Sequence, residues 1–372
     1  MPFCMNRVQH SAKKSGDIAA AGKIADALLA HYDANARTLP WRMPPGGDLP
    51  DPYAVWMSEI MLQQTTVAAV IPYFERFTAR WPNFAALASA DDADVMAAWA
   101  GLGYYARARN LLKCARMVAD THNGQMPETE AELLRLPGVG PYTAAAIASI
   151  AFGKRAVVVD ANVERVVSRL FAIGTPLPAA RAQIYAAADS ITPAARSGDF
   201  AQAMMDLGAG YCSVRAPSCP LCPVSVYCET FANEQAESYP VKAPKKVKPI
   251  RLGMAYWIEY SGQVLLIQRP SAGMLAGMRA LPSDNWAAGR NGDSAPPFAA
   301  DWRILDAVIH HSFTHFTLHM QVTVTEGRPQ TNLGEYWPVN LLDKAGLPTL
   351  FSKAVAVMKA DQPAASKIRI EG

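Results

Sequence analysis

Apolar residues recur every three or four positions along most of the first 230 residues, whereas they alternate with polar residues beyond position 250. The first pattern is typical of amphipathic helices packed on a core, and the second is typical of strands. No strand-like alternation stands out before residue 250. This change of pattern therefore predicts an all-helical region followed by a smaller α+β unit.

The helical region divides into short segments joined by turns rich in glycine, proline and asparagine. The first segment has an acidic start, and Asp51-Pro52 supplies an N-cap and a first-turn proline for the second. We expect helices over residues 17–34, 53–64, 67–80, 84–98, 106–121, 128–135, 141–152, 161–172, 180–190 and 199–210.

The strand region begins with two apolar runs, Met254–Tyr260 and Gln263–Gln268, which flank Ser261-Gly262 and predict a hairpin. A second strand region covers residues 310–325, and a helix from about 352 to 358 closes the unit. On a single strand, His311, His315 and His319 would share a face, as metal ligands can, although no cysteine or carboxylate cluster accompanies them.

A glycine-rich turn, Leu136-Pro137-Gly138-Val139-Gly140, precedes Pro141 and an alanine-rich helix that another backbone can approach closely. Free N–H groups at such a helix start suit a phosphate. Asp160 follows three valines and precedes the next helical pattern. A carboxylate placed there is either an N-cap or a catalyst.

Glu59 lies in the middle of the apolar helix 53–64, and Gln63 projects from the same face. A buried glutamate needs either a partner or a raised pKa that keeps its proton. Glu59 is therefore either a structural partner of a core arginine such as Arg42 or a candidate acid.

Residues 101–110 read GLGYYARARN, a glycine-flanked turn that presents two tyrosines and then Arg107 and Arg109. Such a turn can insert a ring into a base stack and touch phosphates. The alternative is a buried tyrosine pair beside a solvated arginine face.

The 372-residue chain is 51% hydrophobic with a net charge of +3, which by itself neither favours nor excludes nucleic acid. It has no membrane-length apolar run and no clear secretion signal at its N-terminus. We expect a monomer in the cytoplasm, associated with the nucleoid if the source is bacterial. The linker 232–250 carries four lysines and is either a solubilising tether or a basic strap along DNA.

Four of the six cysteines lie in one short stretch, which favours a metal site in a reduced compartment over a disulfide framework. The spacing is Cys212-x6-Cys219-x2-Cys222-x5-Cys228. Four cysteines can hold zinc, but zinc sites usually pair two close-spaced units. A [4Fe–4S] cluster accepts one close pair with longer arms.

Together these motifs resemble the adenine DNA glycosylase family (MutY type) of the helix-hairpin-helix glycosylase superfamily. The resemblance extends over nearly the whole chain and depends on several motifs in order. They are WMSEIMLQQT (56–65), GLGYYARARN (101–110), LPGVGPYTA (136–144), VDANVERV (159–166), the four-cysteine spacing and SFTHFTL (312–318).

The resemblance implies a multidomain protein with a helical catalytic region, 1–231, and a Nudix-like lesion-recognition domain, 251–372. Within the first, a six-helix helix-hairpin-helix module would span about 36–155, and an iron–sulfur module would combine 1–35 with 156–231. The stretch from Gly273 to Trp286 lacks the acidic Nudix metal ligands, so the C-terminal domain should bind rather than cut.

The implied substrate is duplex DNA with adenine opposite 8-oxoguanine or guanine, and the reaction is hydrolysis of the adenine N-glycosidic bond. Glu59 matches the general acid, and Asp160 matches the carboxylate that faces the sugar, with Asn162 holding it. Tyr142 matches a tyrosine beside Asp160, and it replaces the Schiff-base lysine of related bifunctional enzymes, which favours base removal without strand cleavage.

The resemblance also implies the DNA contacts and the cluster ligands. Trp41 and Arg42 would line the adenine pocket, and Gln63 and Tyr104 would wedge into the duplex. The full set of predicted substrate and DNA contacts is Trp41, Arg42, Gln63, Gln64, Tyr104, Gly138, Gly140, Phe313, Thr314 and His315. The [4Fe–4S] ligands would be Cys212, Cys219, Cys222 and Cys228.

Two positions depart from the family pattern: Thr314 stands where serine is common, and Ala161 follows Asp160 where many members have glycine. Two other functions compete with this one. A pyrimidine-lesion glycosylase with lyase activity is disfavoured by Tyr142 and the C-terminal domain. A catalytically silent iron–sulfur DNA-binding scaffold is disfavoured by the presence of both Glu59 and Asp160.

Overall fold

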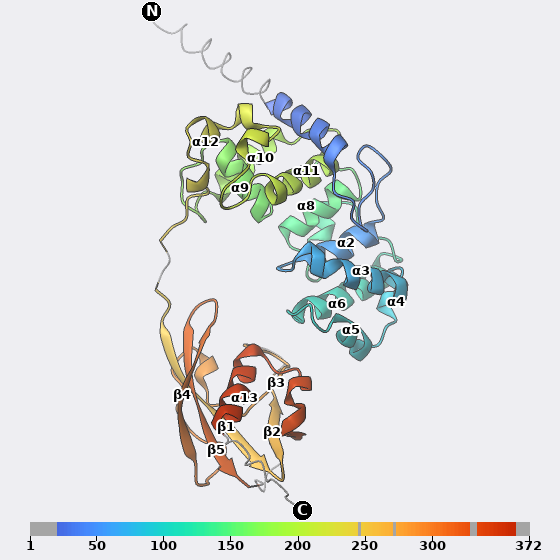
Figure 1. Ribbon diagram of the computed structural model, residues 1–372. Coiled ribbons are helices and arrows are strands. Elements are labelled where there is room, and N and C mark those ends of the chain that lie inside the picture. The colour runs from blue at the N-terminus through green and yellow to red at the C-terminus, as the bar shows by residue number, and fades with distance from the viewer. Residues whose placement is uncertain (1–20, 245–246, 271–272, 328–332, 362–372) are drawn as a thin grey trace, which may run out of the picture. The chain divides into compact units, whose positions relative to one another are not determined.

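The computed structural model describes residues 21–244, 247–270, 273–327 and 333–361. The chain divides into two compact units, Met1–Pro244 and Lys245–Gly372 (Figure 1). The predicted start of the first helix at Asp17, and two lysines of the predicted linker, Lys245 and Lys246, lie outside the described residues. In the described ranges, no helix is long and apolar enough to cross a membrane.

The first unit is helical, as predicted, and most of its helices lie where the apolar periodicity places them. A helix through residues 21–35 opens the described chain. The others are α2 (Pro52–Leu62), α3 (Val67–Arg80), α4 (Phe84–Ala88), α5 (Asp92–Trp99), α6 (Ala106–Thr121), α7 (Glu130–Leu133), α8 (Pro141–Ile150), α9 (Ala161–Leu170), α10 (Arg181–Ile191), α11 (Ser197–Gly210) and α12 (Glu229–Ala232).

One helix prediction is wrong, because residues 84–98 form two helices rather than one. α4 ends at Ala88, and Asp91 begins α5 by accepting a hydrogen bond from the backbone N–H of Ala93. An aspartate side chain competes well for backbone donors and so favours a cap over a helix interior. The apolar spacing alone did not reveal this break.

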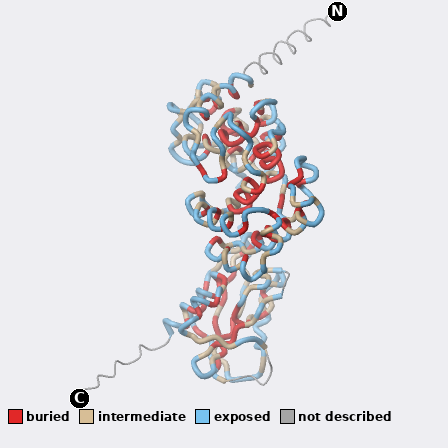
Figure 2. The backbone as a smooth tube through the Cα atoms, turned by 90° about the vertical axis from the view of Figure 1, so that its right-hand side faces the viewer, coloured by how far each residue is buried: buried red, intermediate tan, exposed pale blue. Residues whose placement is uncertain are grey.

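Two hydrophobic cores lie in the helical unit. One is built from α2 to α8, and the other from the helix at 21–35 together with α9, α10 and α11. Buried residues run through the middle of both the helices and the central strands (Figure 2). The predicted close approach to the alanine-rich helix is confirmed, because Gly198 of α11 lies against the backbone of α8.

The second unit is a small α+β fold, as predicted. Its strands are β1 (Ile250–Tyr260), β2 (Gln263–Gln268), β3 (Arg279–Ala280), β4 (Arg303–Ser312), β5 (Thr317–Glu326) and β6 (Glu335–Pro338), and helix α13 spans Thr349–Asp361. The strand order is β3-β2-β1-β5-β4, with β6 paired to β2. The strand β1 runs parallel to β5, and the other pairings are antiparallel. The apolar side chains of α13 join the main core of the sheet.

The predicted hairpin is confirmed, with Tyr260 opposite Gln263 and with positive φ at both Ser261 and Gly262. Two left-handed residues suit the tight turn of a twisted hairpin. The strand region predicted over 310–325 is confirmed, but it contains parts of two antiparallel strands, β4 and β5, with His310 opposite His319. The shared face proposed for His311, His315 and His319 on a single strand is therefore lost.

Part of the predicted linker is attached to the helical unit. The backbone N–H of Leu177 donates to the carbonyl of Val241 at 2.8 Å, and Leu177 forms an isolated parallel bridge with Lys242. Arg169 also donates to the carbonyl of Tyr239 at 3.1 Å. A free tether therefore cannot include residues 239–242.

The α8–α11 crossing provides a test of the helical packing. A Cβ at Gly198 would lie 2.5 Å from the carbonyl oxygen of Ser149, and backbone cannot move aside cheaply. We expect Gly198→Ala to lower the free energy of unfolding by about 1–3 kcal/mol. Gly210 of the same helix has nothing within 4 Å of its Cβ position, so Gly210→Ala should be neutral or slightly stabilising. Urea denaturation followed by circular dichroism measures both, and equal effects would contradict the close approach.

Candidate active site

A cavity of about 770 Å³ lies within the helical unit and contains most of the predicted catalytic residues. Its lining combines apolar side chains with a few polar groups that point toward one another, as ligand sites in proteins usually do. Eight of the predicted site residues line it: Trp41, Arg42, Glu59, Gln63, Gln64, Tyr142, Asp160 and Asn162. The two carboxyl groups on which the sequence analysis depends therefore face one space.

Glu59 enters the cavity from α2, a helix that is buried over most of its length. Only 6% of the residue is exposed. Burial raises the pKa of the Glu59 carboxyl to about 7, and the charge of Asp160 adds to this, whereas the Tyr142 hydroxyl and Arg42 act in the opposite direction. Near neutral pH, Glu59 can therefore carry a proton to a bound molecule.

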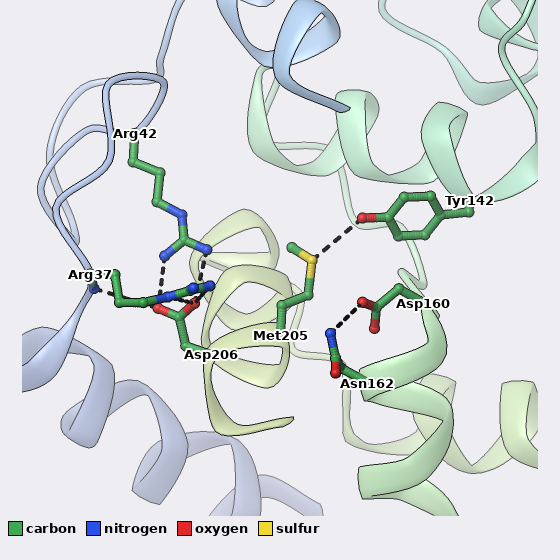
Figure 3. Close-up of polar contacts among 7 residues, drawn as sticks. All are labelled: Arg37, Arg42, Tyr142, Asp160, Asn162, Met205 and Asp206. Carbon is green, nitrogen blue, oxygen red and sulfur yellow. Dashed lines mark hydrogen bonds and ion pairs between the residues drawn. The ribbon is translucent and has the colours of Figure 1, made fainter. Parts of the chain in front are cut away.

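Asp160 is both a helix cap and a member of the cavity lining. One of its oxygens accepts the backbone N–H of Val163 at 2.7 Å, which caps α9. The other accepts Asn162 Nδ2 at 2.9 Å, as the sequence predicted (Figure 3). The Asn162 amide is in turn fixed by Arg165, whose Nη2 donates to Asn162 Oδ1 at 3.0 Å. These contacts hold the Asp160 carboxylate in one orientation.

Tyr142 projects from the first turn of α8 into the same space. Its hydroxyl donates to the Met205 sulfur at 3.4 Å (Figure 3). Burial raises the pKa of Tyr142 well above its usual value, and the neighbouring charges of Glu59 and Asp160 raise it further. The phenol is thus a neutral group beside two carboxyl groups.

Arg42 is not the ion-pair partner of Glu59 that one alternative required. Its guanidinium instead donates to both oxygens of Asp206, at 2.7 and 3.0 Å, and Arg37 binds the same carboxylate from another side (Figure 3). Burial opposes the ionisation of Asp206, but the hydrogen bonds and charges of the two arginines outweigh it and lower its pKa. No arginine of the described residues therefore forms an ion pair with Glu59.

The sequence analysis missed Arg37, Met205 and Asp206, which all lie at this cavity or pair with its lining. A signal for Asp206 existed, because it is an acidic residue in an apolar helical run, AMMDLGA, just as Glu59 is. Arg37 and Met205 carry no comparable local signal, and only the packing of α11 beside residues 37–42 brings them in.

The two predicted DNA-contact turns, around Tyr104 and around Gly138 and Gly140, both lie in the helical unit. Tyr104 is 61% exposed and has a positive φ, as a protruding wedge would require. Gly138 also has a positive φ, and a Cβ there would meet Asn110 at 2.9 Å. Gly140 caps α8, followed by Pro141 at the first helical position as predicted. Arg107 is buried, so for this residue both alternatives, a phosphate contact and a solvated arginine face, are wrong.

Cys212, Cys222 and Cys228 pack against the same hydrophobic core as α9. Burial raises the pKa of Cys222 to about 11, and the charges of Cys212, Cys228 and Cys219 also raise it. Among the described residues, no three potential ligands are close enough to hold a single ion. Sulfurs around one tetrahedral zinc ion would lie only about 3.8 Å apart, whereas a cubane cluster separates them further.

Arg169 is the residue that fits an anionic centre at the cysteines. It is 2% exposed, and its Nη1 lies 3.3 Å from the Cys212 sulfur. Its other donors bind the carbonyls of Tyr239, Ser213 and Val214, and no carboxylate pairs with it in the described ranges. A buried guanidinium without a carboxylate is costly unless another negative group is nearby. Four thiolates on a metal centre would provide that charge.

The predicted recognition triplet Phe313-Thr314-His315 occupies the turn between β4 and β5. Phe313 stacks on Trp286 with ring centroids 5.7 Å apart, and its carbonyl accepts Lys248 Nζ at 2.6 Å. Thr314 and His315 are exposed. The turn thus holds an anchored aromatic ring followed by two accessible polar side chains.

Comparisons with known proteins find a family match in each of the two units. Residues 57–187 match the model of the HhH-GPD superfamily base excision DNA repair protein, and residues 253–357 match that of the NUDIX domain. The adenine DNA glycosylase of Homo sapiens is 34% identical, with 93% of this chain and 76% of that protein aligned. That of Buchnera aphidicola subsp. Baizongia pistaciae is 34% identical over 66% of this chain and 68% of its own. A solved thermostable thymine-DNA glycosylase matches 57% of this chain and 97% of its own with a TM-score of 0.52 and 29% identity.

The raised pKa of Glu59 predicts a dependence of stability on pH. Between its ordinary value of 4.5 and about 7, the folded state keeps a proton that the unfolded state releases, so this group makes the protein less stable as pH rises through that range. Glu59→Gln removes the effect, and the variant should be more stable than the parent at pH 8, by on the order of 3 kcal/mol, but not at pH 4. Urea denaturation at both pH values measures this, with the exposed α3 residue Glu75→Gln as the control. A difference that does not change with pH would contradict the buried, protonated carboxyl.

Proposed function

We propose, from the premise that the chain belongs to the adenine DNA glycosylase family of HhH-GPD base excision DNA repair proteins, that its substrate is adenine opposite 8-oxoguanine or guanine in duplex DNA. The observation that carries the mechanism is that Glu59 and Asp160 line one cavity. The N-glycosidic bond is unreachable inside a stacked duplex, so the adenine nucleotide must first be turned out into that cavity.

Glu59 acts as the general acid. Its carboxyl keeps a proton near neutral pH because it is buried, and adenine N7 is the acceptor that makes the base a better leaving group. Arg42 does not neutralise this role, because both of its Nη atoms are engaged by Asp206. As the C–N bond breaks, the proton stays on the departing adenine.

Asp160 faces the sugar and stabilises the positive charge that develops on it. The carboxylate either remains an electrostatic partner of this oxocarbenium-like centre or bonds to it transiently before water completes hydrolysis, as carboxylates do in glycosidases. The hydrogen bonds from Asn162 and from the Val163 N–H hold its two oxygens in place. Tyr142 offers no amine, so the reaction ends at an abasic site without strand cleavage.

The partner is duplex DNA, with Gln63 and Tyr104 as wedge residues and Gln64 as a further DNA contact. The N–H groups around Gly138 and Gly140 contact phosphates. Trp41 forms part of the adenine pocket wall. The NUDIX unit recognises the opposite base through Phe313, Thr314 and His315. The aromatic anchoring of Phe313 and the exposure of the next two side chains support this assignment.

Cys212, Cys219, Cys222 and Cys228 would hold a [4Fe–4S] cluster, with Arg169 beside Cys212 balancing its negative charge. When bound, such a cluster supplies a rigid cross-link in a region whose other contacts are turns and short 3₁₀ segments, η1 (Cys219–Leu221) and η2 (Ser225–Tyr227). The spacing of the four cysteines, with one close pair and longer arms, supports a cluster over zinc.

Excision assays test the proposed reaction directly. Under single-turnover conditions the protein should release adenine from A:8-oxoguanine and A:G duplexes and leave a thymine-glycol duplex intact. Glu59→Gln should slow release by on the order of 10² to 10⁴-fold, because the leaving base is no longer protonated. Asp160→Asn should act in the same direction, and borohydride should trap no Schiff base. Intact adenine in both mispairs, or cleavage of the thymine-glycol strand, would sink the proposal.

Metal analysis tests the cluster. The purified protein should be brown, with about four irons per chain, and Cys219→Ser should lose iron and unfold at lower temperature. Cys114, a buried cysteine of α6, provides the control, because Cys114→Ser should keep its iron. A colourless protein that contains one zinc would rule out the iron–sulfur assignment.

A further inference from the structure

The buried Arg107 of α6 connects the two turns that carry the proposed wedge residues. Only 8% of it is exposed, and no carboxylate pairs with it among the described side chains. Burial lowers the pKa of its guanidinium, so the site is poor for a cation unless many acceptors surround it. Its two Nη atoms carry all of the hydrogen bonds found for it in the described residues, and its Nε is buried without a partner there.

One side of the guanidinium caps the end of α2. Nη1 donates to the carbonyls of Ile60 and Met61 at 3.1 and 2.8 Å, and Nη2 donates to Thr65 Oγ1 at 3.1 Å. The last carbonyls of a helix have no partner within the helix, and a cation there is favourable. Gln63 and Gln64 lie between these acceptors in the chain, and Gln64 has a positive φ of 57°.

The other side holds the glycine-flanked turn. The same Nη2 donates to the carbonyls of Leu102 and Gly103 at 3.0 and 3.4 Å. The next residue, Tyr104, has a positive φ of 49° and points outward. A left-handed conformation is unfavourable for a tyrosine and persists only where the surroundings fix it. Tyr104 also lies with its ring centroid 5.4 Å from the Arg107 guanidinium carbon.

We propose that Arg107 is a positioning residue that fixes the Gln63-Gln64 turn and the Tyr104 turn relative to each other, so that both enter the duplex together when adenine is turned out. The inference depends on the proposed glycosylase function but concerns a different step. Arg107 is not itself a member of the cavity lining, and its side chain is buried, so it reaches the cavity only through Thr65 and the DNA-contact turns only through its hydrogen bonds. Its effect should be on extrusion of the base, and it should not alter cleavage of the bond once the base is out.

A lysine cannot replace this arginine. Five acceptors surround the guanidinium, in two directions set by two different turns. A lysine ammonium has three donors on one atom, so it cannot replace two nitrogens that together serve five acceptors. Arg107→Lys therefore keeps the charge but loses part of the hydrogen bonds, and Arg107→Met removes both the charge and the hydrogen bonds.

The test compares two duplexes that differ only in how firmly adenine is stacked. In the first, an A:8-oxoguanine pair lies between matched pairs, and in the second the same pair lies between two mismatched pairs, which make extrusion easier. Single-turnover release is measured for the parent, for both Arg107 variants and for Lys113→Met, an exposed charge loss on the same helix.

We expect Arg107→Lys and Arg107→Met to slow release from the matched duplex by on the order of 10- to 100-fold, and from the loosened duplex by less than about threefold. Lys113→Met should leave both rates unchanged. Equal slowing on the two duplexes, or no slowing on either, would overturn the positioning role, and the lysine variant decides the question if the methionine variant does not fold. A parent protein that releases adenine from neither duplex would instead overturn the proposed function.

Discussion

The burial of the Glu59 carboxyl determines both the chemistry of the cavity and the pH dependence of the stability of the helical unit. The helix that carries it is packed through Trp56, Met57 and Met61, none of which is exposed, so Glu59 cannot turn to solvent without unpacking the core. Ionisation of a carboxyl in that position lowers the stability of the folded protein. The same burial gives it a pKa of about 7, and an acid with that pKa is the group that the proposed chemistry requires. The same buried carboxyl therefore lowers the free energy of unfolding above neutral pH and supplies the proton that the proposed reaction needs.

Two other carboxylates, Asp160 in the cavity lining and Asp206 beside it, have quite different surroundings from Glu59, and this difference keeps Glu59 available. Asp206 takes two arginines, and Asp160 takes two N–H donors. If Asp206 were absent, Arg42 would be free to turn toward Glu59 and lower its pKa, since it already acts in that direction. Three acidic residues in one region thus divide into a proton donor, a capped carboxylate and an arginine acceptor.

Much of this arrangement could be predicted from the sequence, because it depends on local rules. Asp160 caps α9 and accepts a hydrogen bond from Asn162, and both contacts follow from the reach of a side chain over two or three residues. The start of α8 at Pro141 follows from the backbone preference of proline for the first helical position. The fold class and the glycosylase resemblance followed from motifs in a fixed order. What could not be predicted depends on contacts distant in sequence: Asp206 with Arg37 and Arg42, and Arg107 with the end of α2. The spacing of Arg107 looked like a surface contact, and only tertiary packing made it a buried capping residue.

Helix α11 shows how residues without functional groups set the geometry of those that have them. It brings Met205 and Asp206 to the cavity region and also crosses both α8 and α9. A Cβ at Gly208 would lie 2.6 Å from the Cβ of Asn162, so the bare backbone there determines how closely α9 can approach. Arg165 donates to the Gly208 carbonyl at 2.6 Å and to Asn162, which fixes the amide that holds Asp160. A side chain at position 208 would therefore displace a carboxylate that it does not touch, because the displacement would pass through Asn162 and its backbone in the first turn of α9.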